Sequence, residues 1–147
     1  MPKPKPKVLI DTNILISGLV FLKGNEHKIL KLAEERKIVL VLPEFVLEEG
    51  RLVLARSFPG HEALLDAFLT RVEHTVLPWK EIGQSAFAYA KKVRDEKDAP
   101  LLASVIAAKP DFTVTGDVAL REDMKRCSEV AGVTKICSSR QFLEAIA

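Results

Sequence analysis

Short apolar runs that alternate with longer amphipathic stretches constrain the fold of this chain more than any other feature. The clearest is 38–42 (IVLVL), whose unbroken apolar side chains are typical of a strand buried on both faces. Further strands are expected at 8–10, 73–77, 112–115 and 134–137. Strands that alternate with helices predict a parallel sheet covered on both faces. We therefore expect a three-layer α/β/α fold with a central, mostly parallel five-stranded sheet.

The amphipathic stretches between these runs predict the helices. We expect them from residue 14, at 26–35, 43–55, 61–71, 81–94 and 98–108, then a short one through 120–124 and a last one that Ser138 or Ser139 caps. In the stretch 81–94, the expected apolar face consists of Ala86, Phe87, Ala90 and Val93.

The length of 147 residues fits one domain. We expect residues 1–6 to form a flexible basic tail and residues 7–147 a single folded domain. Without Lys3, Lys5 and Lys7, the 22 basic residues become 19 against 20 acidic ones. The folded part is therefore near neutral, and its charge gives no separate indication of nucleic-acid binding.

Composition also bears on location. No apolar run approaches the ~20 residues that a membrane-spanning helix needs, so we expect no membrane association. Cys127 and Cys137 lie ten residues apart without a metal-binding spacing. Reduced thiols in a cytoplasmic protein are the main interpretation, and a disulfide between the two cysteines is the alternative.

Three aspartates stand where a parallel sheet would bring them together. Asp11 follows the first apolar run in VLIDTN, Asp117 follows the fourth in FTVTGD, and Asp98 opens the helical stretch DAPLLASVIAA. The carboxyl ends of neighbouring parallel strands form one crevice, where these carboxylates should converge. Converging carboxylates repel one another unless a cation lies among them, and hard oxygen ligands favour Mg²⁺ or Mn²⁺. The pattern predicts a metal-dependent enzyme that acts on phosphates.

Each aspartate alone has a structural interpretation, because Asp is among the best N-caps and all three precede expected helices. For any single one, capping is the stronger interpretation. The set is harder to explain by capping, since a Ser or Thr could cap equally well. Polar companions also surround the set, namely Thr12, Asn13 and Thr115.

A fourth acid is expected on the helix after the second strand, in LPEFVLEEGRLVL. Glu44 lies in its first turn, where the helix dipole favours a carboxylate, so we interpret it as structural. Glu48 and Glu49 flank the inward face on opposite sides, and helical periodicity does not choose between them. At least one of the two is expected to be a solvated charge.

In their order and spacing, these blocks resemble a PIN domain. The blocks are DTN, an acid on the third helix, D-x-P-L-L-A-x-x-x-A-A and T-G-D. The resemblance runs from about Lys7 to the end of the chain. Within the superfamily it is strongest to the PIN-family (VapC-like) toxins of bacterial and archaeal toxin–antitoxin systems.

The resemblance implies roles for particular residues. Glu49 matches the family's second acid, six residues after Pro43, where relatives often have Ser; Glu48 is the alternative. Asn13 and Thr115 match residues that position substrate or water. The implied catalytic acids are Asp11, Glu49, Asp98 and Asp117, of which Asp11, Asp98 and Asp117 would bind one or two Mg²⁺ or Mn²⁺ ions.

The implied activity is metal-dependent endoribonuclease cleavage of RNA, leaving a 5′-phosphate and a 3′-hydroxyl. The implied partners are a cognate antitoxin and a second copy of the chain. Trp79, Phe58 and Phe21 are candidates for that homodimer interface, with core packing as the alternative. Many relatives carry a further Asp two residues after T-G-D, where this chain has Ala119. The second hypothesis is therefore a catalytically inactive PIN-like RNA-binding or protein-interaction module.

Overall fold

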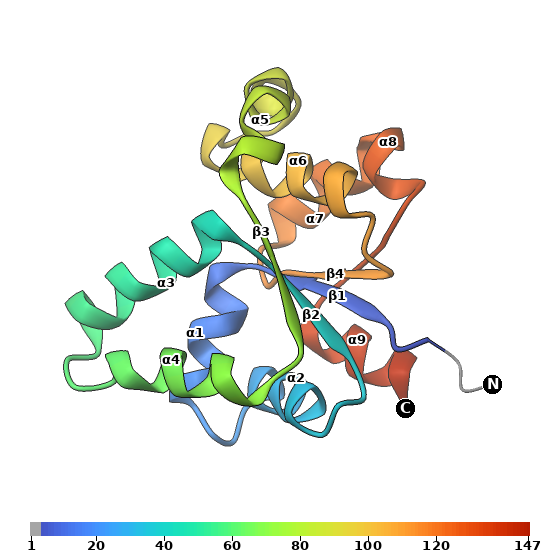
Figure 1. Ribbon diagram of the computed structural model, residues 1–147. Helices are drawn as coiled ribbons and strands as arrows, with labels where there is room; N and C mark the ends of the chain where they lie inside the picture. Colours follow the sequence, from blue (N-terminus) through green and yellow to red (C-terminus); the bar gives the residue numbers. More distant parts are fainter. Residues whose placement is uncertain (1–3) are drawn as a thin grey trace.

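The structure, a computed structural model, describes residues 4–147, so the first half of the expected tail lies outside the described residues. Five strands form one sheet in the order β3-β2-β1-β4-β5, and every neighbouring pair is parallel (Figure 1). The strands are β1 (Lys7–Ile10), β2 (Val39–Pro43), β3 (His74–Leu77), β4 (Phe112–Val114) and β5 (Lys135–Cys137). The expected α/β fold is confirmed, and the sheet is wholly parallel.

Helices cover both faces of this sheet because its central strands are apolar on both sides. Side chains alternate along a strand, so Val8 and Ile10 enter one core while Leu9 enters the other. The first core is completed by α1 (Thr12–Val20), α2 (Asn25–Glu34), α3 (Glu44–Ser57), α4 (Glu62–Arg71) and α9 (Ser139–Ile146). The second is completed by α5 (Gly83–Tyr89), α6 (Ala99–Ala108), α7 (Val118–Arg126) and α8 (Ser128–Ala131).

The stretch 81–94 is not one helix, and this expectation was wrong. It contains α5 between two 3₁₀ turns, η1 (Trp79–Glu81) and η2 (Ala90–Lys92), and the backbone is extended at Val93. Helix α5 buries Ala86 and Tyr89, whereas Phe87 is 87% exposed. The expected apolar face therefore wrongly included Phe87. Helix α8 was not expected from the sequence.

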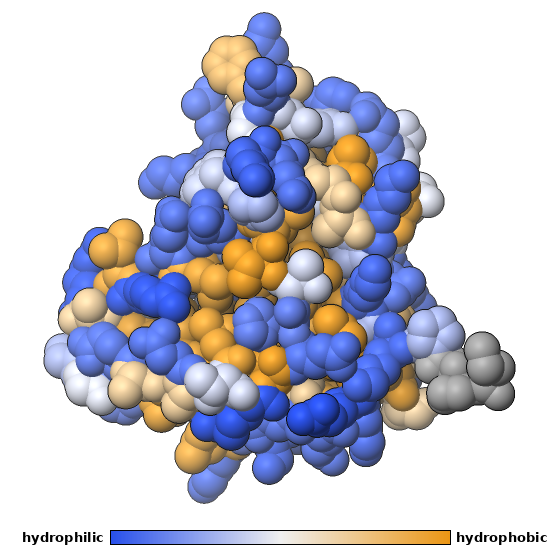
Figure 2. Space-filling model, in the orientation of Figure 1, coloured by the Kyte–Doolittle hydropathy of each residue, from blue (hydrophilic) through white to orange (hydrophobic). Residues whose placement is uncertain are grey.

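The surface has an uncovered sheet edge at β3. Apolar side chains gather in the middle of the face shown in Figure 2, where β3 runs, and Val76 of this strand is 43% exposed. The described part of the expected tail lies near the same region, since Lys5 Nζ is 2.8 Å from Glu73 Oε2. None of the helices within residues 4–147 is long and apolar enough to cross a membrane. Cys127 and Cys137 are both buried free thiols.

The three aromatic residues considered for an interface have different surroundings. Phe58 is half-buried and packs against the core that contains α1 to α4. Phe21 is 56% exposed and packs edge-on against Phe58, and Trp79 is 37% exposed and packs against Phe45.

Candidate active site

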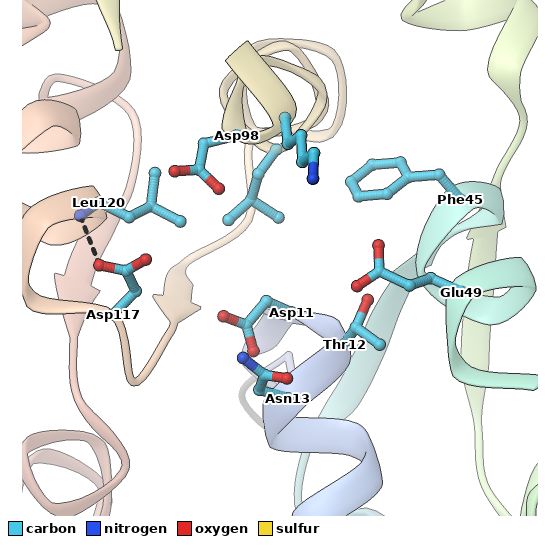
Figure 3. Close-up of a pocket in the computed structure, with 10 residues that line it drawn as sticks. Asp11, Thr12, Asn13, Phe45, Glu49, Asp98, Asp117 and Leu120 are labelled. Atoms are coloured by element: carbon cyan, nitrogen blue, oxygen red, sulfur yellow. Dashed lines mark hydrogen bonds between the residues drawn. The ribbon is translucent and has the colours of Figure 1, made fainter. Parts of the chain in front are cut away.

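A cavity of about 100 Å³ lies at the carboxyl-terminal edge of the sheet (Figure 3). Among its lining residues are Asp11, Asn13, Glu49, Asp98 and Asp117, together with one cation, Lys97. The expected carboxylates therefore come from four separate segments and meet in one place, because the parallel strands deliver β1 and β4 to the same edge. In Figure 3, Asp98 and Asp117 lie on one side and Glu49 on the other, with Asp11 between them.

Asp11 lies at the exit of β1 and holds both carboxylate oxygens in hydrogen bonds. Oδ1 accepts from the backbone N–H of Ile14 at 2.9 Å, which makes Asp11 the N-cap of α1. Oδ2 accepts from the hydroxyl of Thr115. The capping interpretation is therefore correct for Asp11, and it does not exclude a site, because the same bonds fix the carboxylate at the edge of the cavity.

Thr115 connects Asp11 to Asp117. Its hydroxyl donates to Asp11 and accepts from the backbone N–H of Asp117 at 3.2 Å. Thr115 is fully buried behind Asp11 and is not among the cavity's lining residues. Asp117 caps α7 by accepting from Leu120 N–H at 3.1 Å. The Thr115 hydroxyl therefore fixes the positions of the two aspartates, and Thr115 itself does not line the cavity.

Glu48 and Glu49 point to different surroundings in the structure. Glu49 lines the cavity, whereas Glu48 Oε2 accepts a hydrogen bond from the indole Nε1 of Trp79 at 3.2 Å. Glu44, one helical turn before Glu48, accepts from the backbone N–H of Trp79 at 3.2 Å, in agreement with a structural role. Of the two candidates for the second acid, only Glu49 faces the other carboxylates.

Asp98 differs from the other two aspartates because its side chain makes no capping bond to the helix that follows it. It ends the 3₁₀ turn η3 (Glu96–Asp98), which leads directly into α6. The segment before it is tied to α7. Arg94 donates from its backbone N–H to Asp123 Oδ2 at 2.9 Å, and its Nε lies 3.1 Å from Asp123 Oδ1. Asp123 is 5% exposed and is not among the residues that line the cavity. Its contacts with Arg94 therefore hold the segment that carries Asp98.

The carboxylates influence one another electrostatically. Burial, followed by the neighbouring charges of Asp117, Asp95, Asp123 and Asp11, raises the pKa of Asp98 to about 6. Burial also raises the pKa of Asp11, against the opposing effect of its hydrogen bonds from Thr115 and Ile14. Raised carboxyl pKa values are expected where several acids share a partly desolvated site, and a cation among them would favour the charged forms.

The residues fit a hydrated divalent ion. Every expected ligand is a carboxylate oxygen, as Mg²⁺ and Mn²⁺ prefer. Within residues 4–147, no three His, Cys, Asp or Glu side chains lie close enough together to enclose an ion. This spacing suits an ion that keeps several waters and takes only one or two carboxylates directly. It does not suit an ion held wholly by protein.

The chain belongs to the PIN domain family, since the family model described as "PIN domain" matches residues 7–119. All four acids of the cavity fall within this match. The family resemblance indicated by the sequence motifs is thus confirmed.

Among solved structures, the fold is similar to a chain in the crystal structure of VapBC2 from Rickettsia felis bound to a DNA fragment from their promoter. The TM-score is 0.62 at 16% sequence identity, covering 88% of this chain and 98% of that chain. At this identity the likeness establishes the fold alone. No curated protein matches the sequence.

Several features of the site were not expected from the sequence. Phe45 lines the cavity beside the acids, and Asp123 anchors the segment that carries Asp98. A signal for Phe45 existed, because it lies one helical turn before Glu49 on the same helix. No local pattern indicated the Arg94–Asp123 contact, which joins residues 29 positions apart. The catalytic and metal-binding roles of the lining residues remain predictions.

Proposed function

We propose that this PIN domain is a metal-dependent endoribonuclease with Asp11, Glu49, Asp98 and Asp117 as its catalytic acids. The observation that carries the proposal is that these four carboxylates, from four separate segments, line one cavity. Membership of a family whose members are generally nucleases supports it.

Asp11, Asp98 and Asp117 are the proposed ligands of one or two Mg²⁺ or Mn²⁺ ions, directly or through water. Such an ion, when bound, polarises the phosphodiester and lowers the pKa of a bound water. Glu49 faces the three aspartates from the opposite wall and is placed to orient a water or accept its proton.

The remaining residues position the reactants. Asn13 is exposed at the start of α1 and lines the cavity, so its amide can bind a phosphate oxygen or a water. Thr115 keeps Asp11 in place, and Lys97 brings a positive charge to the wall where an anionic substrate would enter. Among the described lining residues there is no His, Ser or Cys, in agreement with attack by water.

The proposed biological role is that of a toxin with a cognate antitoxin, acting on cytoplasmic RNA as a homodimer. The fold similarity to a chain of VapBC2 from Rickettsia felis supports this role. The second candidate is a PIN-like RNA-binding or protein-interaction module without catalysis. One observation favours it: Ala119 stands where many relatives have an acid.

Cleavage of a mixed RNA panel tests the proposal. We expect cuts with 5′-phosphate ends in Mn²⁺ or Mg²⁺, none in chelator, and none with Asp11→Asn. Glu48→Gln is the matched control, because this residue lies one position from Glu49 but faces Trp79 instead of the cavity. Cleavage that survives Asp11→Asn would indicate a contaminating nuclease. Absence of cleavage in all conditions would favour the non-catalytic module.

A further inference from the structure

An aromatic pair extends the wall of the acid cavity outward to the surface. Phe45 of α3 lines the cavity, and its ring projects from the same wall as Glu49 (Figure 3). Trp79 lies against it, with ring centroids 5.5 Å apart and ring planes at 45°. Trp79 is 37% exposed although it is the largest side chain type in proteins. The two rings thus form a continuous apolar surface that begins beside the carboxylates and ends in solvent.

Trp79 is held in a fixed orientation by two carboxylates on one face of α3. Its backbone N–H donates to Glu44 and its indole N–H donates to Glu48, both at 3.2 Å. Both hydrogen-bond donors of the residue are therefore satisfied within the protein. The part of Trp79 that is left to contact a ligand is its aromatic ring, which favours stacking over hydrogen bonding.

We infer that Trp79 and Phe45 form a stacking platform for a nucleobase next to the phosphate in the acid cavity. The inference rests on the proposed function in that the cavity takes the scissile phosphate. Proteins bind single strands with aromatic side chains that stack on bases and with cations that track the backbone. Trp79 and Phe45 supply the first element, and Lys97 supplies the second.

The platform is accessible only to a base that is not paired in a duplex. Bases within an A-form duplex are stacked on one another, and a side chain reaches their faces only where the strand is unpaired. A phosphate that lies among the carboxylates while its neighbouring base lies on Trp79 must therefore belong to a loop, a bulge or a free strand. Stacking on this platform is expected to be independent of which base it is.

Trp79 is the one tryptophan of the chain, so its fluorescence reports directly on this surface. The experiment titrates the intact protein, in Ca²⁺, which carboxylate oxygens also bind, with a 12-nucleotide oligo(A), with an abasic ribose-phosphate 12-mer, and with an RNA duplex of equal length. Gel analysis afterwards verifies that the RNA is intact. We expect oligo(A) to change the Trp79 emission at lower concentration than either the abasic chain or the duplex.

Variants distinguish a contribution of the aromatic ring to RNA binding from a contribution of apolar packing. Trp79→Leu keeps an apolar side chain but removes the ring, and should weaken binding of a labelled oligo(A) by about 5- to 150-fold. Trp79→Phe keeps an aromatic face and should restore most of the affinity. Phe87→Leu is the control, because Phe87 is an aromatic residue of α5, 87% exposed, that does not line the cavity. Thermal unfolding verifies that each variant is folded.

The outcomes distinguish this inference from the proposed nuclease. Base-dependent binding through Trp79 without any cleavage would support the platform while contradicting catalysis. Metal-dependent cleavage with equal binding of oligo(A) and the abasic chain would overturn the platform while leaving the nuclease intact. A change in Trp79 emission on concentrating the protein alone, with none on adding RNA, would assign this surface to a second copy of the chain and overturn the inference.

Discussion

Replacing Asp98 with Asn should stabilise the metal-free protein at neutral pH. Asp98 makes no capping hydrogen bond to α6, so the substitution removes a charge without removing such a bond. The pKa of Asp98 is about 6, against an ordinary value of 3.8, because burial and the neighbouring carboxylates disfavour its charged form. The charge is therefore a cost to the folded state whenever no cation is present.

The size of this cost follows from proton linkage. Between pH 3.8 and about 6, the folded chain retains on Asp98 a proton that the unfolded chain has released. Stability therefore falls as the pH rises through this window and is constant above it. For a group fully shielded from solvent, a pKa that is higher by about two in the folded chain lowers the free energy of unfolding at neutral pH by about 3 kcal/mol. Asp98 is partly exposed, so solvent screening reduces the expected gain from Asp98→Asn to about 1 kcal/mol at pH 7.5.

Urea unfolding in chelator at pH 4 and pH 7.5 measures this difference. Asp98→Asn should gain stability relative to wild type at pH 7.5 and little at pH 4. Glu96→Gln is the control, since it removes an exposed carboxylate two residues away that does not line the cavity. A loss of 1 kcal/mol or more by Asp98→Asn at pH 7.5 would refute the reasoning and assign Asp98 a structural bond that outweighs the repulsion.

Three other predictions test the site and its support. Thr115→Val removes the hydroxyl that joins the two capping aspartates and should lower cleavage or metal affinity about 10- to 100-fold, measured by turnover and metal titration; unchanged values would contradict it. Glu49→Gln should abolish RNA cleavage while Glu48→Gln retains it, and the reverse result would exchange their roles. Arg94→Ala should lower the urea midpoint, because it removes the ion partner of buried Asp123; an unchanged midpoint would show that this contact contributes little.

The convergence of the aspartates could be predicted from the sequence because parallel topology leaves few alternatives. Asp11 ends an apolar run, and the short segment Thr115–Gly116 places Asp117 just after another. In a parallel sheet both run ends lie at the same edge, whatever the details of packing. Local patterns were therefore sufficient for the sheet and for the position of these two residues.

The choice between Glu48 and Glu49 could not be made from the sequence, because it depends on a contact distant in the chain. Both lie beside the buried face of α3, and Glu48 is assigned by its bond to Trp79, 31 residues away. The prediction of one helix over residues 81–94 was wrong for a similar reason. Its local pattern favours a continuous helix, whereas the backbone is extended at Val93, just before Arg94 bonds to the distant Asp123 on α7.

Calorimetric titration of Mn²⁺ into the metal-free protein tests most directly whether the four acids form one cation site. We predict saturable binding to wild type, with affinity lost in Asp11→Asn and retained in Glu48→Gln. Binding that is unaffected by Asp11→Asn would place the ion elsewhere. No binding at millimolar Mn²⁺ would contradict a metal-dependent site and leave the cavity as part of a non-catalytic PIN domain.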